Sequence, residues 1–274
     1  MTNNLIVKKT DLTLSNYIAE EIGFSNALIH SVFPNGFNLI TKDKQLIFVG
    51  KATKPLSAYG LAIEDAVFER IQPLLAVEDK AQLTKDRLTI QTNTSTIQLE
   101  WNEVVIRSLT LPNWQFNAHQ QTSLLTQLQS FPLWNDSGFV LNPSLTQLFN
   151  QWRQGSIDDE DTLFNLVGAG VGLTPSGDDF IQGLMMMERL TPSSTRVEDR
   201  MEDILTRRNT TDVSRAYYDI LAKGYVNETW IDLFQAVKLN QPHKMKQAIE
   251  EIRHYGSTSG NDLLLGVQMY LESI

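Results

Sequence analysis

The 274-residue sequence contains no cysteine, which excludes disulfide bonds, thiolate metal sites and a cysteine nucleophile. It also lacks any run of about 18 apolar residues, the length at which a helix spans a bilayer. Its first residues, MTNNLIVKKTDLTLSN, have no apolar segment of the kind found in signal peptides. These absences predict a cytoplasmic protein that does not enter a membrane.

Positive charge is scarce, because 23 Lys and Arg residues face 32 Asp and Glu residues and leave a net charge of −9. Nucleic acid and anionic membrane surfaces both require a basic face, so neither is expected as a partner. A small anionic metabolite remains compatible, since backbone N–H groups and one or two local cations suffice to bind it. The four histidines show no metal-ligand spacing. The sequence therefore leaves any metal unknown.

The first part of the chain has the pattern of an antiparallel β structure. Short apolar or alternating runs extend from about 27 to 110, and polar pairs such as Asn93-Thr94 and Asn102-Glu103 are candidate turns between them. A helix is expected near 12–22 and a short one at 62–71. The pattern predicts a β-rich barrel or sandwich-like domain with an N-terminal helix over residues 1–115.

The second part of the chain is helical in pattern throughout. One segment, NPSLTQLFNQWRQG, offers Asn142 as an N-cap, Pro143 in the first turn and Gly155 at the end. We therefore expect an α+β protein whose residues 116–274 form an all-helical domain.

One phrase occurs twice in the helical part. GLTPSGDDFIQG (172–183) and STSGNDLLLG (257–266) align from Thr174 and Ser257, and each reads hydroxyl, any residue, Ser, Gly, Asp or Asn, Asp, three residues, Gly. In the simplest interpretation each copy is a capping box, with Ser176 and Ser259 as N-caps. Such a cap contributes about 1 kcal/mol to a helix.

Three features go beyond what a cap requires. Four glycines, at 168, 170, 172 and 177, permit a loop whose amides converge on a ligand. The second acid of the Asp178-Asp179 pair is free to hold Mg²⁺, to orient a donor or to act as a base. Gly183 and Gly266 each lie four residues beyond the motif Asp, where they permit close backbone approach. We therefore expect the two helices to pack together around a pseudo-twofold axis, with both N-termini at one site for a doubly anionic small molecule.

Other motifs are absent or ambiguous. GAGVGL does not match the dinucleotide fingerprint, and the P-loop pattern is missing. The segment RRNTTDVS (207–214) allows two interpretations that the sequence leaves open. It is either a helix end followed by a new cap at Thr211 or Asp212, or a third polar loop that supplies hydroxyls and a guanidinium to an oxyanion.

The motif strings resemble a known family. GLTPSGDDFIQG, NTTDVSRAYYDILAKG, STSGNDLLLG and the earlier HSVFPNGFNLI and QLIFVG, together spanning about 28–266, are similar to the AllH-like family. Its namesake is a subunit of the oxamate carbamoyltransferase complex of bacterial allantoin catabolism, a route of purine degradation. The resemblance implies other subunits as partners and carbamoyl transfer as the reaction, in which oxalurate and phosphate give oxamate and carbamoyl phosphate.

In that reaction the two motifs would bind the anions and stabilise the oxyanion of the tetrahedral intermediate. The candidate catalytic residues are Asp178, Asp179 and Asp262. The candidate substrate-binding residues are Gly172, Thr174, Ser176, Gly177, Thr210, Ser214, Ser257, Ser259, Gly260 and Asn261. No residue is an evident nucleophile, so positioning and electrostatics would carry catalysis. The alternatives are a non-catalytic metabolite-binding or scaffold subunit and, without any ligand, two capped helices.

Overall fold

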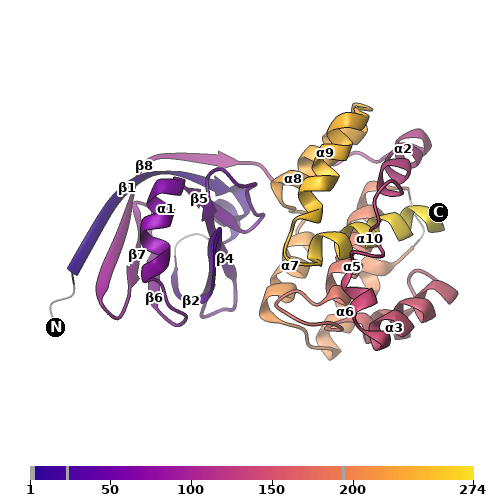
Figure 1. Cartoon of the computed structure of the whole chain (residues 1–274), viewed down its shortest axis with the longest axis horizontal. Helices are drawn as coiled ribbons and strands as arrows, with labels where there is room; N and C mark the ends of the chain where they lie inside the picture. The colour runs from indigo at the N-terminus through magenta and orange to yellow at the C-terminus, as the bar shows by residue number, and fades with distance from the viewer. Residues whose placement is uncertain (1–3, 23–24, 193–194) are drawn as a thin grey trace. The chain divides into compact units, whose positions relative to one another are not determined.

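A computed structural model describes residues 4–22, 25–192 and 195–274. The chain divides into two compact units. Unit 1 comprises Met1–Thr110 together with Tyr225–Glu228, and unit 2 comprises Leu111–Gly224 together with Thr229–Ile274. In Figure 1 the colours run from indigo and magenta in the strands to orange and yellow in the later helices.

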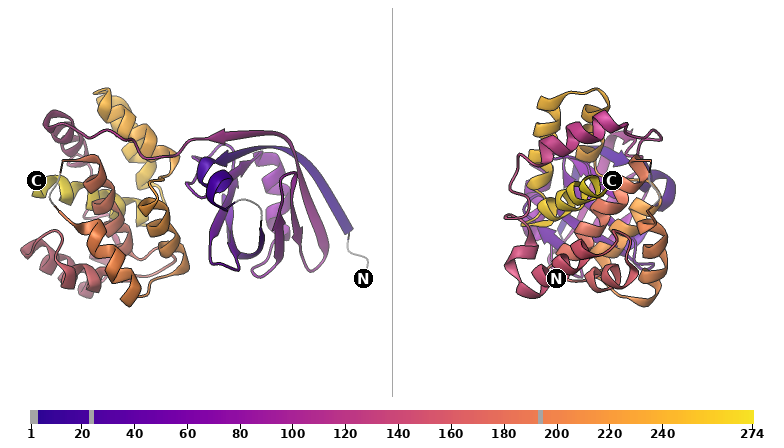
Figure 2. Two further views of the ribbon diagram at one scale, coloured as in Figure 1. Left: turned by 180° about the vertical axis from the view of Figure 1, so that it is seen from behind. Right: turned by 90° about the vertical axis from the view of Figure 1, so that its right-hand side faces the viewer.

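Unit 1 is a closed eight-stranded barrel with the strand order β1-β5-β4-β3-β2-β6-β7-β8. Figure 2 shows from behind how the strands curve around the interior. The interior is filled by fully buried side chains from alternate strand positions, such as Phe37, Leu39, Leu88 and Ile90. The strands are β1 (Asn4–Ser15), β2 (Asn26–Phe33), β3 (Gly36–Thr41), β4 (Leu46–Lys51), β5 (Gly60–Ile63), β6 (Lys80–Leu83), β7 (Arg87–Gln91) and β8 (Ser95–Arg107).

The helical elements of unit 1 are short. They are the π-helical turn η1 (Ile18–Ile22), helix α1 (Asp65–Ile71) and the 3₁₀ turn η2 (Gln72–Leu74). The helix expected near 12–22 is therefore wrong in its first part, because residues up to Ser15 pair with β8 as a strand. Pairing along two edges outweighs a helical pattern that local sequence alone suggests.

Two further expectations for unit 1 need correction. The pair Asn102-Glu103 is no turn, because β8 continues through it with a bulge where Thr10 pairs with Trp101 and Leu12 with Val104. The barrel is also not purely antiparallel, since β1 pairs with β8, and β4 with β5, in parallel. The β1–β8 pair joins segments far apart in sequence, such as Asn4 with Ser95, which no local pattern reveals.

Unit 2 is helical, as expected. Its elements are α2 (Ala118–Leu128), the 3₁₀ turn η3 (Gly138–Leu141), α3 (Pro143–Gln154), α4 (Glu160–Leu166), α5 (Ser176–Leu190), α6 (Val197–Arg207), α7 (Asp212–Ala222), α8 (Glu228–Lys238, whose first residue belongs to unit 1), α9 (Pro242–Arg253) and α10 (Ser259–Ser273). Helix α3 is capped by the Asn142 side chain, has Pro143 in its first turn and ends at Gly155, as its sequence predicts. No helix in the described ranges has the length and apolarity needed to cross a bilayer.

Helix α5 is the most buried element of unit 2. Every residue from Ser176 to Met187 is buried, and this helix packs against α10. A helix that is buried on all sides belongs to the centre of a domain. The three consecutive methionines at 185–187 are therefore core residues, and the polar residues at the start of α5 are placed in an apolar environment.

Candidate functional site

Helices α5 and α10 touch backbone to backbone at Gly183 and Gly266, the last glycine of each motif. A Cβ on Gly183 would clash with the Leu263 carbonyl oxygen, and one on Gly266 would clash with that of Phe180. A Cβ on Gly183 would also lie only 3.0 Å from the Gly266 Cα, and a Cβ on Gly266 only 3.1 Å from the Gly183 Cα. The second glycine of each motif is thus explained by this close crossing.

The two motif copies also share their local architecture. Each begins with a helix end, since Ala169 N–H donates to Leu166 O and Tyr255 N–H donates to Ile252 O, both at 2.9 Å. In each, the first motif glycine then folds back, because Gly177 N–H donates to Ala169 O at 2.9 Å and Gly260 N–H to Tyr255 O at 3.1 Å. The first copy has a longer loop between these points. The repeat in sequence is therefore a repeat of a helix–loop–helix unit.

This architecture corrects two expectations. The Gly177 and Gly260 amides donate to carbonyl groups of their own loops, so they are not available to a ligand. A side chain at either glycine would clash with the Leu166 or Ile252 carbonyl, which accounts for the residue type. The serines are also not N-caps. The N-caps are Pro175 and Thr258, neither of which makes a side-chain capping bond, so Ser176 and Ser259 are free for other contacts.

The hydroxyl groups of the two copies meet. The Thr174 and Ser259 hydroxyls lie 2.7 Å apart, although one belongs to each motif. Burial raises the pKa of Asp179 well above its usual range, the charge of Asp262 raises it further, and the Ser259 and Thr174 hydroxyls oppose the shift. The Asp179 carboxyl of the first motif thus interacts with the hydroxyl of Ser259 in the second motif.

The second carboxyl is served in the reciprocal way. Burial raises the pKa of Asp262 from 3.8 to about 6, and the Gly138 N–H and the nearby Ser176 hydroxyl oppose the shift. The Gly138 N–H donates to Asp262 Oδ1 at 2.8 Å. Asp179 Oδ2 and Asp262 Oδ2 are both buried and have no hydrogen-bond partner in the described residues. A buried oxygen without a partner is rare in native structures, and this cluster contains two.

Asp178, the first acid of the first motif, has a different role. Asp178 accepts hydrogen bonds from Gly168 N–H at 3.1 Å, Tyr218 Oη at 3.0 Å and Thr210 Oγ1 at 2.5 Å. Burial raises the pKa of Asp178, and burial together with the Asp178 charge raises that of Tyr218. Asp178 thereby ties the glycine loop to α7.

Its counterpart in the second motif, Asn261, accepts a hydrogen bond from Arg253 Nε at 3.0 Å. That arginine also contacts Asp136 at 2.7 Å. The two copies therefore differ in charge at this position.

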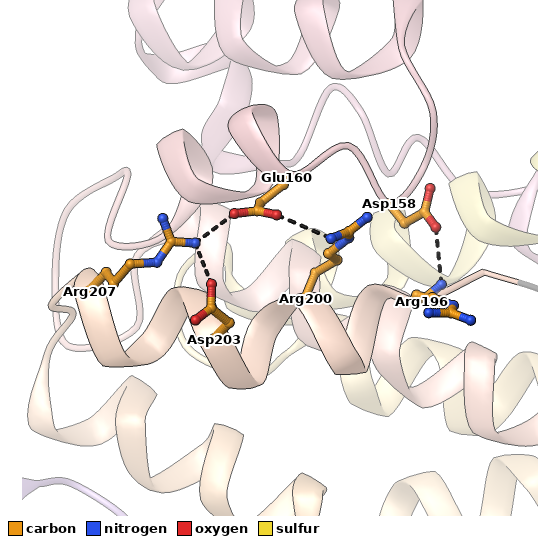
Figure 3. Close-up of polar contacts among 6 residues, drawn as sticks. All are labelled: Asp158, Glu160, Arg196, Arg200, Asp203 and Arg207. Carbon is orange, nitrogen blue, oxygen red and sulfur yellow. Dashed lines mark hydrogen bonds and ion pairs between the residues drawn. The ribbon is translucent and has the colours of Figure 1, made fainter.

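The 207–214 segment combines features of both interpretations. Thr211 is the N-cap of α7, because its side chain accepts from Ser214 N–H at 3.0 Å. Thr210 does join the site through Asp178. The Arg207 guanidinium is held by Glu160 and Asp203 in the ion-pair network of α4 and α6 drawn in Figure 3. The segment thus contributes a hydroxyl, and Arg207 is engaged elsewhere.

Two runs of backbone N–H groups remain free beside the carboxyl cluster. Within the described residues, the N–H groups of 170–173 and of 256–259 donate to no acceptor. Gly170 and Gly172 have positive φ angles of 134° and 91°, a conformation that favours glycine. Gly172 and Ser257 are exposed, whereas Ser214 is buried. Of the predicted site residues, the structure joins Thr174, Ser176, Ser259, Asp179 and Asp262 in one cluster, with Asp178 and Thr210 attached to the same loop.

Three contributing residues gave no signal in the sequence. Gly138 lies in a segment that looks like a connector, yet a Cβ there would clash with Ser176 Oγ and lie 3.1 Å from Thr258 Oγ1. Tyr218 and Arg253 lie inside helices where an aromatic or basic residue is ordinary. Within the described parts of the chain, no group of three or more His, Cys, Asp or Glu residues is arranged to hold a metal ion.

Comparison with known protein families gives two matches and places this geometry in context. The family described as oxamate carbamoyltransferase subunit AllH matches residues 166–271, which contain both motifs. The AllH family N-terminal domain matches residues 7–104, which form the barrel. No solved structure matches the chain. With both of its units matched, the chain belongs to the AllH family of oxamate carbamoyltransferase subunits.

Proposed function

We propose that the helical unit binds a small oxoanion, phosphate or a carboxylate such as oxamate or oxalurate, at the paired motif loops and contributes to carbamoyl transfer. The observation that carries the proposal is the contact between the two motifs. In it each buried carboxyl, Asp179 or Asp262, interacts with a serine hydroxyl of the other copy. The free N–H groups of 170–173 and 256–259 flank this meeting point and are suitable anion donors.

Buried acids at an anion site require an explanation. Burial raises the pKa of both Asp179 and Asp262, and the charge of Asp262 raises that of Asp179 further, so the pair holds a proton at a pH where exposed aspartates do not. A neutral carboxyl donates a hydrogen bond, and a carboxylic acid kept neutral in an apolar site is known to serve in an oxyanion hole. The cluster therefore accommodates an anion without a metal ion.

The same residues suit the proposed chemistry. Carbamoyl transfer breaks the bond between the carbamoyl carbon and the oxamate nitrogen and forms one to a phosphate oxygen. The nitrogen takes up a proton, and the attacking phosphate gives one up. A pKa of about 6 lets Asp262 exchange a proton near neutral pH. The Thr174 and Ser259 hydroxyls act on Asp179 and the Ser176 hydroxyl on Asp262, so in this proposal they relay the proton.

A scaffold subunit that binds the metabolite without turning it over is the second candidate. It is favoured by the deep burial of the carboxyls, since Asp179 is 2% exposed and Asp262 is fully buried. Assays with oxalurate and phosphate separate the two functions. Turnover by the chain alone would support an enzyme, whereas binding without turnover would support the scaffold.

The test of binding is a thermal-shift titration with inorganic phosphate, oxamate, oxalurate and carbamoyl phosphate. A ligand at 100 times its Kd stabilises by about 2.7 kcal/mol, which corresponds to a Tm rise of about 2–4 °C for a chain of this size. We expect the rise to disappear in Ser259→Ala and Asp179→Asn and to persist in Ser130→Ala, an exposed serine at the end of α2. An unchanged rise in Ser259→Ala, or no rise with any of the four, would contradict the proposal.

A further inference from the structure

The second half of β8 has one open edge. The pairing of β7 with β8 ends at Arg87 and Glu100. Beyond that point the described strands pair with β8 only through β1, from Leu12 with Val104 to Ser15 with Arg107. Figure 1 shows β1 and β8 running together as long strands. After the bulge, every second residue from Val104 to Arg107 therefore presents N–H and C=O groups that pair with no other strand in the described residues.

The open edge is apolar on both faces. Val104 is 48% exposed, Val105 51% and Ile106 58%. Consecutive residues of a strand point to opposite faces, so neither face of this segment is covered. Soluble proteins protect such edges with charges, prolines or a covering element, because an open apolar edge is a template for another strand. Among the described residues, no charge, proline or covering element protects Val104–Ile106.

We propose that this edge pairs with the same edge of a second copy of the chain, antiparallel and with Val105 on the twofold axis. In this register Val104 lies opposite Ile106, and Glu103 lies opposite Arg107 at both ends of the contact. Opposite charges and β-branched side chains are favourable cross-strand pairs, whereas like charges are unfavourable. The Arg107 side chain is 58% exposed and uses one nitrogen for Glu228, which leaves its second terminal nitrogen for the partner.

Neighbouring registers lose this complementarity. A shift of one residue in one direction places Glu103 opposite Ile106, and a shift in the other places Arg107 opposite Val104. Only the register centred on Val105 pairs both charges and all three apolar residues. A twofold contact of this kind closes on itself, so it forms a dimer without leaving a further open edge.

A single cysteine tests the register directly, because the natural chain has none. Opposed Cβ atoms in an antiparallel pair lie about 4.5–5.5 Å apart, close to the spacing of a disulfide. We expect Val105→Cys to form a covalent dimer under mild oxidation. Val77→Cys, at a position that is 60% exposed but outside the strands, should stay monomeric under the same conditions. A Val105→Cys chain that remains monomeric would overturn the proposal.

Charge reversal tests the pairing in the unmodified backbone. The full chain should sediment as a dimer in analytical ultracentrifugation. Glu103→Arg should raise the dimer Kd at least tenfold, and the double variant Glu103→Arg and Arg107→Glu should recover most of that loss. Asp43→Arg, in an exposed turn, is the matched control and should leave the Kd unchanged. A monomer at all concentrations, or a dimer whose Kd does not respond to Glu103→Arg, would contradict the proposed edge contact.

Discussion

Asp262 is a buried carboxyl group with no cation in contact among the described residues, so folding makes it a weaker acid. Its pKa rises from 3.8 to about 6, chiefly because burial disfavours the charged form. The native chain then holds this proton more firmly than the unfolded chain does. The stabilising contribution is complete below pH 4 and is lost as the pH rises from about 4 to 6. Asp178 and Asp179 shift in the same direction, while the half-buried Asp65 and Asp158, which accept hydrogen bonds from the Thr53 and Ser156 side chains, shift in the opposite one.

We therefore expect Asp262→Asn to gain stability relative to the natural chain as the pH rises from 4 to 7. A shift of about two pKa units corresponds to about 3 kcal/mol in the free energy of unfolding. The asparagine keeps an oxygen that can accept from Gly138 N–H. Urea unfolding followed by tryptophan fluorescence at each pH measures the difference. Asp43→Asn is the control, and equal pH profiles for Asp262→Asn and the natural chain would refute the burial argument.

The pair of helices α5 and α10 depends on two positions that have no side chain. Sequence reasoning predicted this packing, because a glycine four residues after each motif Asp has no role in a cap. It did not predict how the serines are used. An S-x-x-D string before an apolar run reads as a capping box, but the backbone begins each helix one residue earlier and turns the serine toward the other copy. Contacts between distant segments leave no trace in local spacing, so Gly138, which is 124 residues from Asp262, and Tyr218, which is 40 residues from Asp178, were also missed.

Substitution of either crossing glycine should separate the helices. We expect Gly183→Ala and Gly266→Ala each to lower the free energy of unfolding by at least about 2 kcal/mol, because the added methyl group meets a backbone carbonyl that cannot move aside. Gly155→Ala is the matched control, since its methyl group would have no neighbour closer than 3.7 Å. Chemical denaturation measures all three. Gly155→Ala should stabilise the chain slightly if anything, because alanine restricts the unfolded backbone. A loss in this control as large as that at Gly183 would contradict the crossing as the cause.

The whole molecule consists of two units, and each unit is made of two separate segments of the chain. The expected boundary at 115/116 lies close to the division at Thr110/Leu111, but Tyr225–Glu228 also belongs to the barrel unit. Glu228 Oε2 accepts from Leu56 N–H at 2.9 Å, and Asn227 Oδ1 accepts from Ala58 N–H at 2.8 Å. A four-residue segment that rejoins the first unit has no distinctive composition. A domain boundary predicted from composition and periodicity therefore cannot include it.

Loss of these acceptors should loosen the barrel. In Asn227→Ala and Glu228→Ala we expect the Ala58 and Leu56 amides, respectively, to exchange with solvent about tenfold faster or more, since each loses an acceptor worth about 1.5–3 kcal/mol when charged and about 1 kcal/mol when neutral. Hydrogen exchange of the full chain measures this. Glu69→Ala, which removes an exposed partner of Lys51, should leave both amides unchanged. Protection that survives both changes would show that the segment does not stabilise the barrel.

The parallel pairing of β1 with β8 also sets an order of events during synthesis. Asn4 emerges from the ribosome early, but its partner Ser95 is among the last residues of the barrel to be made. At a synthesis rate of about 5–20 residues per second, the edge of β1 that pairs with β8 stays unpaired for some seconds. The barrel closes only after the final strand has been translated, which makes it a late and slow event. The nascent chain therefore has a defined interval, ending near residue 107, in which a chaperone has an unpaired apolar strand to protect.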